Sequence, residues 1–135
     1  MKITDHTLAV LEKSLDLRAR NQQVIAGNMA NVDTPGYSAR KLSFEEDLRQ
    51  AINKPQTNNK PTHPRHIPVS GGGLDQVQGR IIRNVDTSGV GDGNTVSLDE
   101  EMFSLAENQL LYEAGTQVLK KKLTLLKYAV SDGGR

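Results

Sequence analysis

The sequence contains no cysteine and no tryptophan, and its only aromatic residues are three tyrosines and two phenylalanines among 135 residues. The absence of cysteine excludes disulfide bonds and thiolate chemistry. Hydrophobic residues make up 36% of the chain, which is below the roughly 45–50% of an average globular domain. A large hydrophobic core is therefore not expected, and the length fits one modest domain.

The sequence also lacks a long apolar run and a dominant charge. No segment approaches the roughly 18 consecutive apolar residues that a membrane-spanning helix needs, so no direct membrane span is expected. Residues 1–6 lack the hydrophobic core of a secretory signal, so any export is expected to need no cleaved signal peptide. The 17 basic and 16 acidic residues are mixed along the chain. This mixture excludes the clustered basic surface of a nucleic-acid-binding protein.

The C-terminal part of the chain carries the strongest pattern. Residues there recur in steps of three and four over about four heptads, which is typical of a helix that packs lengthwise on another helix. The stripe comprises Met102, Leu105, Gln109, Tyr112, Thr116, Leu119, Leu123, Leu126 and Val130. A second row, seven residues apart, comprises Leu111, Val118 and Leu125. The pattern predicts a helix over 97–130 that begins with a capping box of Ser97 and Glu100.

The N-terminal segment repeats this two-row design. Its main stripe comprises Leu8, Leu11, Leu15, Arg18, Gln22, Ile25 and Met29, and its flanking row comprises Val10, Leu17 and Val24. Polar residues within such stripes weaken a coiled coil but can fix its register and its partner. The simplest interpretation is one antiparallel pair of helices within a monomer. The second apolar row on each helix favours additional packing between subunits.

The middle of the chain predicts short elements and irregular structure. Ser43 and Glu46 form a second potential capping box, which predicts a short helix over 43–53 with an apolar face of Phe44, Leu48 and Ile52. Four prolines and three consecutive glycines predict no helix over 54–73. The β-branched residues within 76–87 predict a strand or a short hairpin.

The predicted fold class is mainly α. Long N- and C-terminal helices pack as a coiled-coil-like pair, and the middle segment is irregular and partly β. We expect an N-terminal axial helix in residues 1–34, a turn with a short helix and a β-containing segment in 35–96, and a C-terminal axial helix in 97–135.

Residues that could carry chemistry are sparse. His63 and His66 are the only candidate metal pair, but their spacing in a proline-containing loop does not fix both imidazoles on one face. No nearby acid supplies the third ligand that a catalytic zinc site needs. The glycine-rich run 89–93 lacks the Gly-Lys-Ser/Thr of a phosphate-binding loop. No serine can be matched with a histidine and an acidic residue to form a catalytic triad. No catalytic, cofactor or metal site is predicted, and a metal-dependent hydrolase built on the two histidines is a disfavoured alternative.

The strongest candidate for a functional stretch is the turn that follows the N-terminal helix. It reads Asn28-Met29-Ala30-Asn31-Val32-Asp33-Thr34-Pro35-Gly36-Tyr37. Pro35-Gly36 is the preferred central pair of a type II turn. Asn31 and Asp33 can bond to the nearby backbone. Such a turn lets the chain leave a long helix sharply, so that the two terminal helices can lie side by side.

This stretch, after an amphipathic N-terminal helix, resembles the signature of the flagellar basal-body rod and hook family. The family pattern usually reads Asn-x-x-Ala-Asn-x-Asn/Asp-Thr-x-Gly-Tyr, and here Asn28 stands one residue closer to the alanine. The residues that carry the resemblance are Asn28, Ala30, Asn31, Asp33, Thr34, Pro35, Gly36 and Tyr37. The short length, the segment 63–67 and the runs 92–102 and 105–112 narrow the resemblance to the proximal-rod members of the family.

The resemblance implies a structural subunit of the bacterial flagellar basal body, with no catalytic role and no cofactor. Such a subunit assembles helically, connects the membrane ring and export gate to the distal rod, and transmits torque. The implied partners are other copies of the chain, the rod proteins FlgC and FlgF, the rod–ring adaptor FliE and the export gate. The implied location is the periplasmic rod, reached through the flagellar type III export apparatus.

Helix packing and assembly are expected to use the apolar stripes and the C-terminal flanking row. These residues are Leu8, Leu11, Leu15, Ile25, Met102, Leu105, Tyr112, Leu119, Leu123, Leu126, Leu111, Val118 and Leu125. A hypothesis of another class is a small helical binding module that acts alone, such as a secretion chaperone or a regulator. The two hypotheses differ in whether the chain assembles with other subunits.

Overall fold

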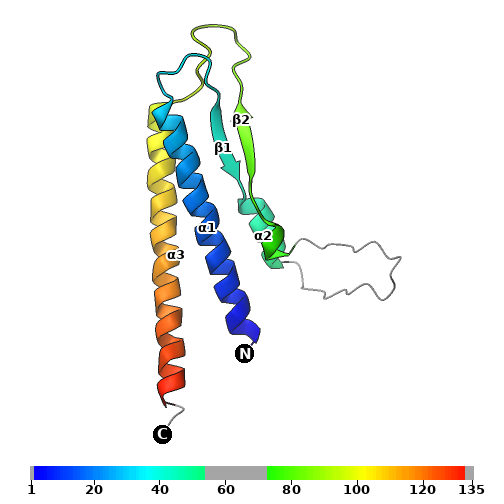
Figure 1. The fold of residues 1–135 in the computed structure, drawn as a ribbon, viewed down its shortest axis with the longest axis vertical. Coiled ribbons are helices and arrows are strands. Elements are labelled where there is room, and N and C mark those ends of the chain that lie inside the picture. Colours follow the sequence, from blue (N-terminus) through cyan, green and yellow to red (C-terminus); the bar gives the residue numbers. More distant parts are fainter. Residues whose placement is uncertain (1, 54–72, 133–135) are drawn as a thin grey trace, which may run out of the picture.

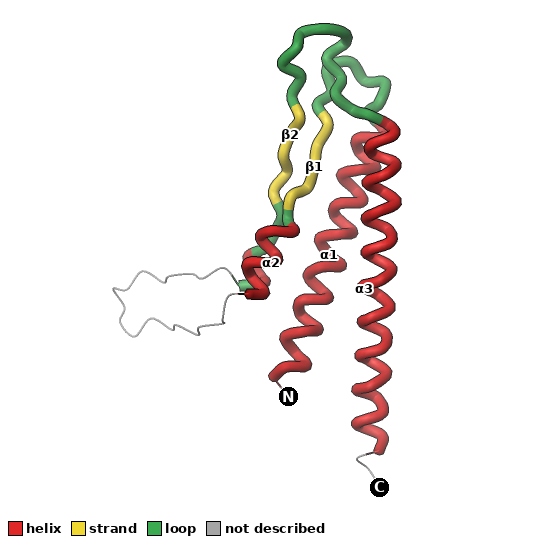
Figure 2. The backbone as a smooth tube through the Cα atoms, turned by 180° about the vertical axis from the view of Figure 1, so that it is seen from behind, coloured by secondary structure: helices red, strands yellow, loops and turns green. Residues whose placement is uncertain are grey.

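The computed structural model describes residues 2–53 and 73–132, and its fold is mainly α, as predicted. Two long helices, α1 (Lys2–Ala30) and α3 (Leu98–Asp132), form most of the structure (Figures 1 and 2). Between them lie β1 (Ala39–Ser43), α2 (Glu45–Asn53), the short 3₁₀ turn η1 (Leu74–Gln76) and β2 (Arg80–Asn84).

Helix α1 is the central element of the molecule. It has α3 on one side, and the two strands with α2 on the other (Figure 1). The two long helices run in opposite directions, and α3 reaches past the N-terminal end of α1 (Figure 1). The 35 residues of α3 correspond to about 52 Å at the usual rise of an α-helix. The C-terminal part of α3 therefore extends beyond the rest of the fold.

The seam between α1 and α3 differs from the predicted stripe by a rotation of about one residue. Five predicted positions on α3 are half-buried, namely Leu105, Tyr112, Thr116, Leu119 and Leu126. Met102 and Leu123, which were predicted to pack in the same stripe, are 55% and 51% exposed. The buried or half-buried positions that replace that half of the stripe are Glu101, Asn108, Gly115 and Lys122.

Polar contacts and one small residue explain this rotation. The Nδ2 atom of Asn28 donates to Oε1 of Glu101 at 2.8 Å, and Nδ2 of Asn108 donates to the carbonyl of Arg18 at 2.9 Å. A Cβ atom at Gly115 would lie 3.0 Å from Cδ2 of Leu15, so the two helices approach closely there. A heptad pattern counts mainly apolar residues, and it therefore missed a seam that is half polar.

The hydrophobic core lies on the other side of α1. Its buried members are Leu17, Leu42, Phe44, Leu48, Ala51, Leu74 and Val77, with Val10 and Val24 packed against them. The flanking row of α1 is thus covered by the middle segment of the same chain. The expectation that this row packs between subunits was wrong for α1, because the middle segment supplies the apolar partner.

The middle segment begins with a strand that the sequence pattern missed. β1 pairs with β2 in antiparallel register, with Leu42 opposite Ile81. Ser43 therefore belongs to β1. In the first helical hydrogen bond of α2, the amide of Leu48 donates to the carbonyl of Phe44 at 2.8 Å. The predicted capping box at Ser43 was wrong by one residue, since Phe44 occupies the cap position. Leu48 is buried as predicted, whereas Ile52 is 40% exposed and Ala51 takes its place in the core.

Strand β2 confirms the strand predicted within 76–87. Its approach to β1 depends on Gly79, which has a φ of 73°. A Cβ atom at this position would lie 3.0 Å from Cδ1 of Leu42. Glycine is therefore required there both by its backbone angle and by the close approach of the core.

Candidate functional site

The turn after α1 is a compact, hydrogen-bonded structure. The amide of Thr34 donates to the carbonyl of Asn31 at 3.0 Å, and the amide of Tyr37 donates to the carbonyl of Thr34 at 3.2 Å. Gly36 has a φ of 71°, which is the left-handed angle that a type II turn requires at its third residue. The Nδ2 atom of Asn31 donates to the carbonyl of Gly27 at 2.8 Å, so its side chain satisfies a carbonyl at the end of α1.

Asn28 is the buried centre of this region, with 1% exposure. Its Nδ2 atom donates to the carbonyl of Arg40 at 2.7 Å and to Oε1 of Glu101 at 2.8 Å. Its Oδ1 atom accepts from the amide of Arg40 at 2.9 Å and from the hydroxyl of Tyr37 at 3.4 Å. All four hydrogen-bonding capacities of the side chain are therefore used. One residue fixes the positions of α1, β1 and α3 relative to one another.

Asn94 holds the turn from the opposite direction. Its Nδ2 atom donates to the carbonyls of Asn31, Val32 and Thr34 at 2.9, 2.8 and 2.9 Å. Its Oδ1 atom accepts from the amide of Val96 at 2.8 Å. Because the amide group has only two hydrogens, at least one of them is shared between carbonyls. Asn94 thus ties the end of α1 to the segment that begins α3.

Thr95 completes the link to the sheet. Its Oγ1 atom accepts from the amide of Ala39 at 2.9 Å and donates to the carbonyl of Asn84 at 2.7 Å. Its own amide donates to the carbonyl of Tyr37 at 3.0 Å. We refer to these connected residues as the polar clasp, which consists of Asn28, Asn31, Tyr37, Asn94, Thr95 and Glu101.

The sequence identified the turn half of the polar clasp but not its other half. Asn94, Thr95 and Glu101 entered the sequence analysis only as members of the run 92–102 that supports the family resemblance, and none of them was predicted to contact the turn. Ser97 does lie directly before α3, and its carbonyl accepts the amide of Glu101 at 3.0 Å. The other predicted turn residues, namely Ala30, Asp33, Thr34, Pro35 and Gly36, are exposed on the outside of the bend.

The pKa of Glu101, a member of the polar clasp, is raised. Burial against α1 raises the pKa of Glu101 above the ordinary value of 4.5. The hydrogen bond from Asn28 lowers this pKa in part, and the nearby carboxylate of Glu100 raises it. The seam therefore disfavours the charged form of this side chain.

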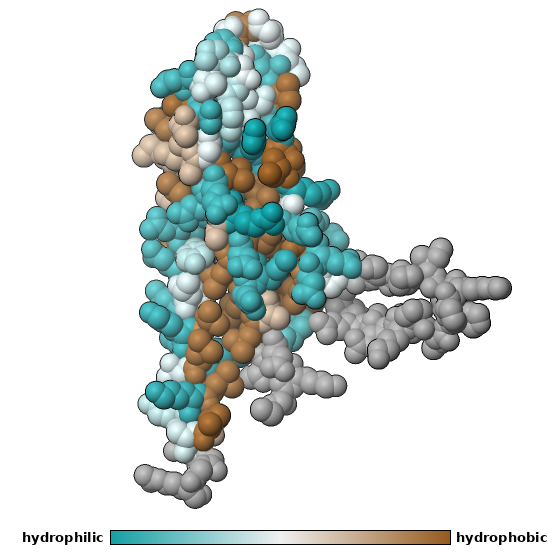
Figure 3. Space-filling view, viewed as in Figure 1, coloured by the Kyte–Doolittle hydropathy of each residue, from teal (hydrophilic) through white to brown (hydrophobic). Residues whose placement is uncertain are grey.

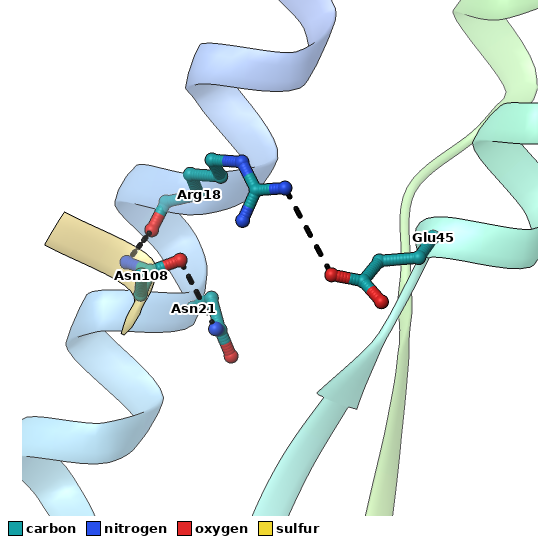
Figure 4. Close-up of polar contacts among 4 residues, drawn as sticks. All are labelled: Arg18, Asn21, Glu45 and Asn108. Atoms are coloured by element: carbon teal, nitrogen blue, oxygen red, sulfur yellow. Dashed lines mark hydrogen bonds and ion pairs between the residues drawn. The ribbon is translucent and has the colours of Figure 1, made fainter. Parts of the chain in front are cut away.

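A second polar layer crosses the same seam about two turns from the clasp. Asn108 is 2% exposed, and its Oδ1 atom accepts from Nδ2 of Asn21 at 3.2 Å (Figure 4). The guanidinium of Arg18 points away from this contact toward Glu45, at 3.8 Å, and lies 5.6 Å from the ring centre of Phe44 (Figure 4). This layer connects α3, α1 and the start of α2, and it fixes the axial register of the helix pair.

The outer face of α3 carries exposed apolar side chains. Leu111, Val118 and Leu125, the predicted flanking row, are 38%, 51% and 69% exposed. Phe103 and Leu110 beside them are 74% and 68% exposed. Apolar surface is also visible over the C-terminal part of α3 (Figure 3). The two long helices thus differ, since the chain covers the second row of α1 and leaves that of α3 open.

The remaining predicted packing residues lie along the helix pair. On α1, Leu8, Leu11 and Leu15 are half-buried, and Ile25 is 4% exposed. Leu15 lies in the seam, where its Cδ2 atom is 3.0 Å from the position of a Cβ atom at Gly115.

A groove of about 900 Å³ lies between the sheet and α3. Arg40 and Arg83 line one wall, and Glu100 and Glu107 line the other. In the part of the chain that the structure describes, no group of three or more His, Asp or Glu residues could hold a metal ion. His63 and His66 lie outside the described residues. Among the described helices, none is long and apolar enough to cross a membrane.

Comparison with known proteins gives this architecture a class. The family described as flagella basal body rod protein matches residues 8–37, which run from α1 through the turn to Tyr37. The flagellar basal body rod protein FlgB of Bacillus subtilis strain 168 is 34% identical over 133 residues, covering 98% of this chain and 99% of the relative. FlgB of Salmonella typhimurium strain LT2 is 34% identical over 124 residues, covering 88% of each chain.

The paired long helices and the turn at their junction are therefore those of a structural subunit of the flagellar basal-body rod. Within that class, the chain belongs to the FlgB family of flagellar basal body rod proteins. FlgB of Escherichia coli strain K12, at 29% identity over 134 residues, covers 96% of both chains. The similarity extends over the middle segment as well as over the two long helices.

Proposed function

We propose that the chain assembles helically in the proximal rod through the outer face of α3, connects the membrane ring and export gate to the distal rod, and transmits torque. One observation supports this proposal above others: the row Leu111, Val118 and Leu125 is exposed on the longest helix of the fold. A row of exposed apolar side chains along one helix is consistent with a protein-interaction site. Heterologous contacts that do not close into a ring produce helical assemblies.

The polar clasp suits the mechanical part of this role. It joins α1, β1 and the start of α3 by side-chain hydrogen bonds to backbone groups. A junction fixed in this way resists changes in the angle between the two long helices. In this proposal, residues 1–34 and 97–135 form the axial core, and 35–96 brace it from the side of α1. The turn residues 28–37 act through geometry and have no catalytic role.

The proposed partners follow from membership of the family. They are other copies of the chain, the rod proteins FlgC and FlgF, the rod–ring adaptor FliE and the export gate. The proposed location is the periplasmic part of the rod, reached through the flagellar export apparatus.

The test is a charge placed in the exposed row. Val118→Asp is expected to leave the purified chain soluble, with unchanged helix content by circular dichroism, because the side chain is 51% exposed. Burying that carboxylate in a subunit contact without a partner is costly, so the variant should be missing from isolated rods and its cells should not swim. Gln109→Asp adds the same charge at an exposed position on another face of α3 and should be incorporated. Normal rods built from Val118→Asp would refute the assembly role of this face.

A further inference from the structure

The exposed side of α3 carries a second regular stripe, distinct from the seam. Its members recur in steps of three and four: Glu100, Phe103, Glu107, Leu110, Ala114, Gln117, Lys121, Thr124 and Tyr128. All of them are exposed. Spacing of three and four places all nine on one face of the helix. Four of them, Phe103, Leu110, Ala114 and Tyr128, have apolar or aromatic side chains. The flanking row 111, 118 and 125 borders the stripe and widens its apolar surface.

The charges on α3 are segregated along its length. Every charged residue from 98 to 119 is acidic, and every charged residue from 120 to 131 is a lysine. Both ion pairs among the described residues, Arg18–Glu45 and Arg80–Asp47, lie outside α3. The acidic half of this helix is thus complementary to the lysine half of another copy, and among the described residues neither half forms an ion pair within the chain.

The spacing of the polar residues on the stripe selects a register. Glu107 and Lys121 are 14 residues apart, as are Ala114 and Tyr128. In a parallel pair without offset, Glu107 would face Glu107 and Lys121 would face Lys121, which is repulsive. An offset of one heptad leaves Glu107 opposite Ala114. An offset of two heptads places Lys121 opposite Glu107 and the large Tyr128 opposite the small Ala114.

Resting on the proposed rod function, we infer that two copies of the chain pack α3 against α3 in parallel, offset by two heptads. The offset corresponds to about 21 Å along the helix axis. An offset of three heptads would pair Glu100 with Lys121 but would shorten the overlap and leave Glu107 opposite Tyr128. The two-heptad offset is also heterologous, so the first copy keeps the last two heptads of its α3, residues 119–132, uncovered for a further subunit.

An antiparallel pair centred on Ala114 is the main competing arrangement. It is two-fold symmetric, so it closes after two copies and cannot extend an assembly. It would also bring Ala114 of one copy next to Ala114 of the other. The two arrangements therefore predict different neighbours for this one residue.

Because the chain has no cysteine, disulfide cross-linking can separate these arrangements. Cells would produce Ala114→Cys and Tyr128→Cys copies together, in place of the wild-type chain, and their isolated rods would be oxidised. A disulfide forms only where the two Cα atoms lie within roughly 7 Å. We expect a cross-linked dimer when both variants are present and none when either is present alone. Circular dichroism of each purified variant controls for its fold.

Exchanging the charges of Glu107 and Lys121 provides a second test, in which incorporation of the variants into rods is measured. Glu107→Lys alone should lower incorporation into rods by about tenfold or more, because it faces Lys121 of the neighbour across the contact. The double variant Glu107→Lys with Lys121→Glu should restore incorporation, since the pair is re-formed with its signs reversed.

The outcomes separate the inference from the proposed function. A dimer from Ala114→Cys alone would show an unstaggered or two-fold contact, and would overturn the inference while leaving the rod function intact. If rods contained both cysteine variants but formed no cross-link, this face of α3 would contact another rod protein. That result would also overturn the inference. Absence of the wild-type chain from isolated rods would instead refute the proposed function.

Discussion

At the scale of single residues, the side chain of Asn28 carries an unusual share of the architecture. It is buried, and it bonds to both backbone groups of Arg40, to Glu101 and to Tyr37. Buried polar groups that lose their partner cost far more than an ordinary hydrogen bond contributes. Replacement of this one amide therefore leaves several groups unsatisfied at the junction of three elements.

We predict that Asn28→Ala lowers the unfolding free energy by about 2–4 kcal/mol, because the amide and carbonyl of Arg40 lose their side-chain partner. Urea denaturation followed by circular dichroism measures this change. Gln23→Ala, at an exposed position of the same helix, should change the unfolding free energy by no more than about 0.5 kcal/mol. Equal effects of the two variants would show that the polar clasp contributes nothing specific.

Glu101 gives a prediction about pH. Its folded-state pKa lies above the ordinary 4.5, so on raising the pH the unfolded chain releases this proton first. The contribution of protonated Glu101 to the free energy of unfolding is therefore complete below pH 4.5, and it is lost as the pH rises through the folded-state pKa. Glu101→Gln keeps an acceptor for Asn28, so it should be more stable than wild type at pH 7, with the advantage disappearing toward pH 4. The measurement is urea denaturation at both pH values.

The matched control for this experiment is Glu100→Gln. Glu100 is exposed in the first turn of α3, where a negative charge is favoured by the helix dipole. Its replacement should lower stability slightly at pH 7, which is the opposite sign. If both variants had a higher free energy of unfolding than the wild type at pH 7, the cause would be a general effect of charge rather than the burial of Glu101.

At the scale of elements, the close approach of α1 and α3 depends on a single small residue. Gly115 faces Leu15 with no room for a branched side chain. We predict that Gly115→Val lowers the unfolding free energy by about 1–3 kcal/mol, because overpacking forces the helices apart. Thermal and urea denaturation measure this change.

Gly27 offers the control within α1. A Cβ atom at Gly27 would meet nothing within 4 Å, so Gly27→Ala should raise the unfolding free energy by up to about 1 kcal/mol through helix propensity alone. If Gly115→Val were as well tolerated as Gly27→Ala, the seam would not be tightly packed at this point.

The elements also show which parts of the fold local sequence can predict. The two long helices were predictable because their patterns repeat over many turns. The strand over 80–84 was predictable because its centre, Ile81 and Ile82, is β-branched. Strand β1 was not predictable from local sequence, because its residues Arg40 and Lys41 are polar and its partner β2 lies far along the chain. Asn94 was missed for the same reason, since its three acceptor carbonyls belong to a turn distant in sequence.

The apolar rows illustrate a further limit of sequence reasoning. Both long helices carry the same two-row pattern, yet the chain covers only the row of α1 that includes Leu17, which is fully buried. A repeat pattern reports that a face needs a partner but does not say whether the partner is in the same chain. The buried seam residues Asn28 and Asn108 were invisible to the pattern because they are polar.

At the scale of the whole molecule, stability is expected to be uneven. Helix α1 is covered by α3 on one side and by the core on the other, whereas the C-terminal part of α3 extends past α1 (Figure 1). Its side chains Leu125, Tyr128 and Val130 are 69%, 64% and 80% exposed. Regions with few buried apolar contacts open locally at low free-energy cost. The two long helices should therefore differ in protection although both are regular α-helices.

Hydrogen exchange tests this difference in the free chain and in rods. We expect amides of 120–131 to exchange about tenfold or more faster than those of 14–28 in the purified chain, because only the latter are covered on two sides. In isolated rods the same C-terminal amides should become protected, since a neighbour then covers the outer face of α3. The soluble Val118→Asp chain, mixed with wild-type rods, should not gain this protection. Equal protection of both segments in the free chain would mean that α3 is stable without a neighbour, and the link between its exposed face and assembly would be lost.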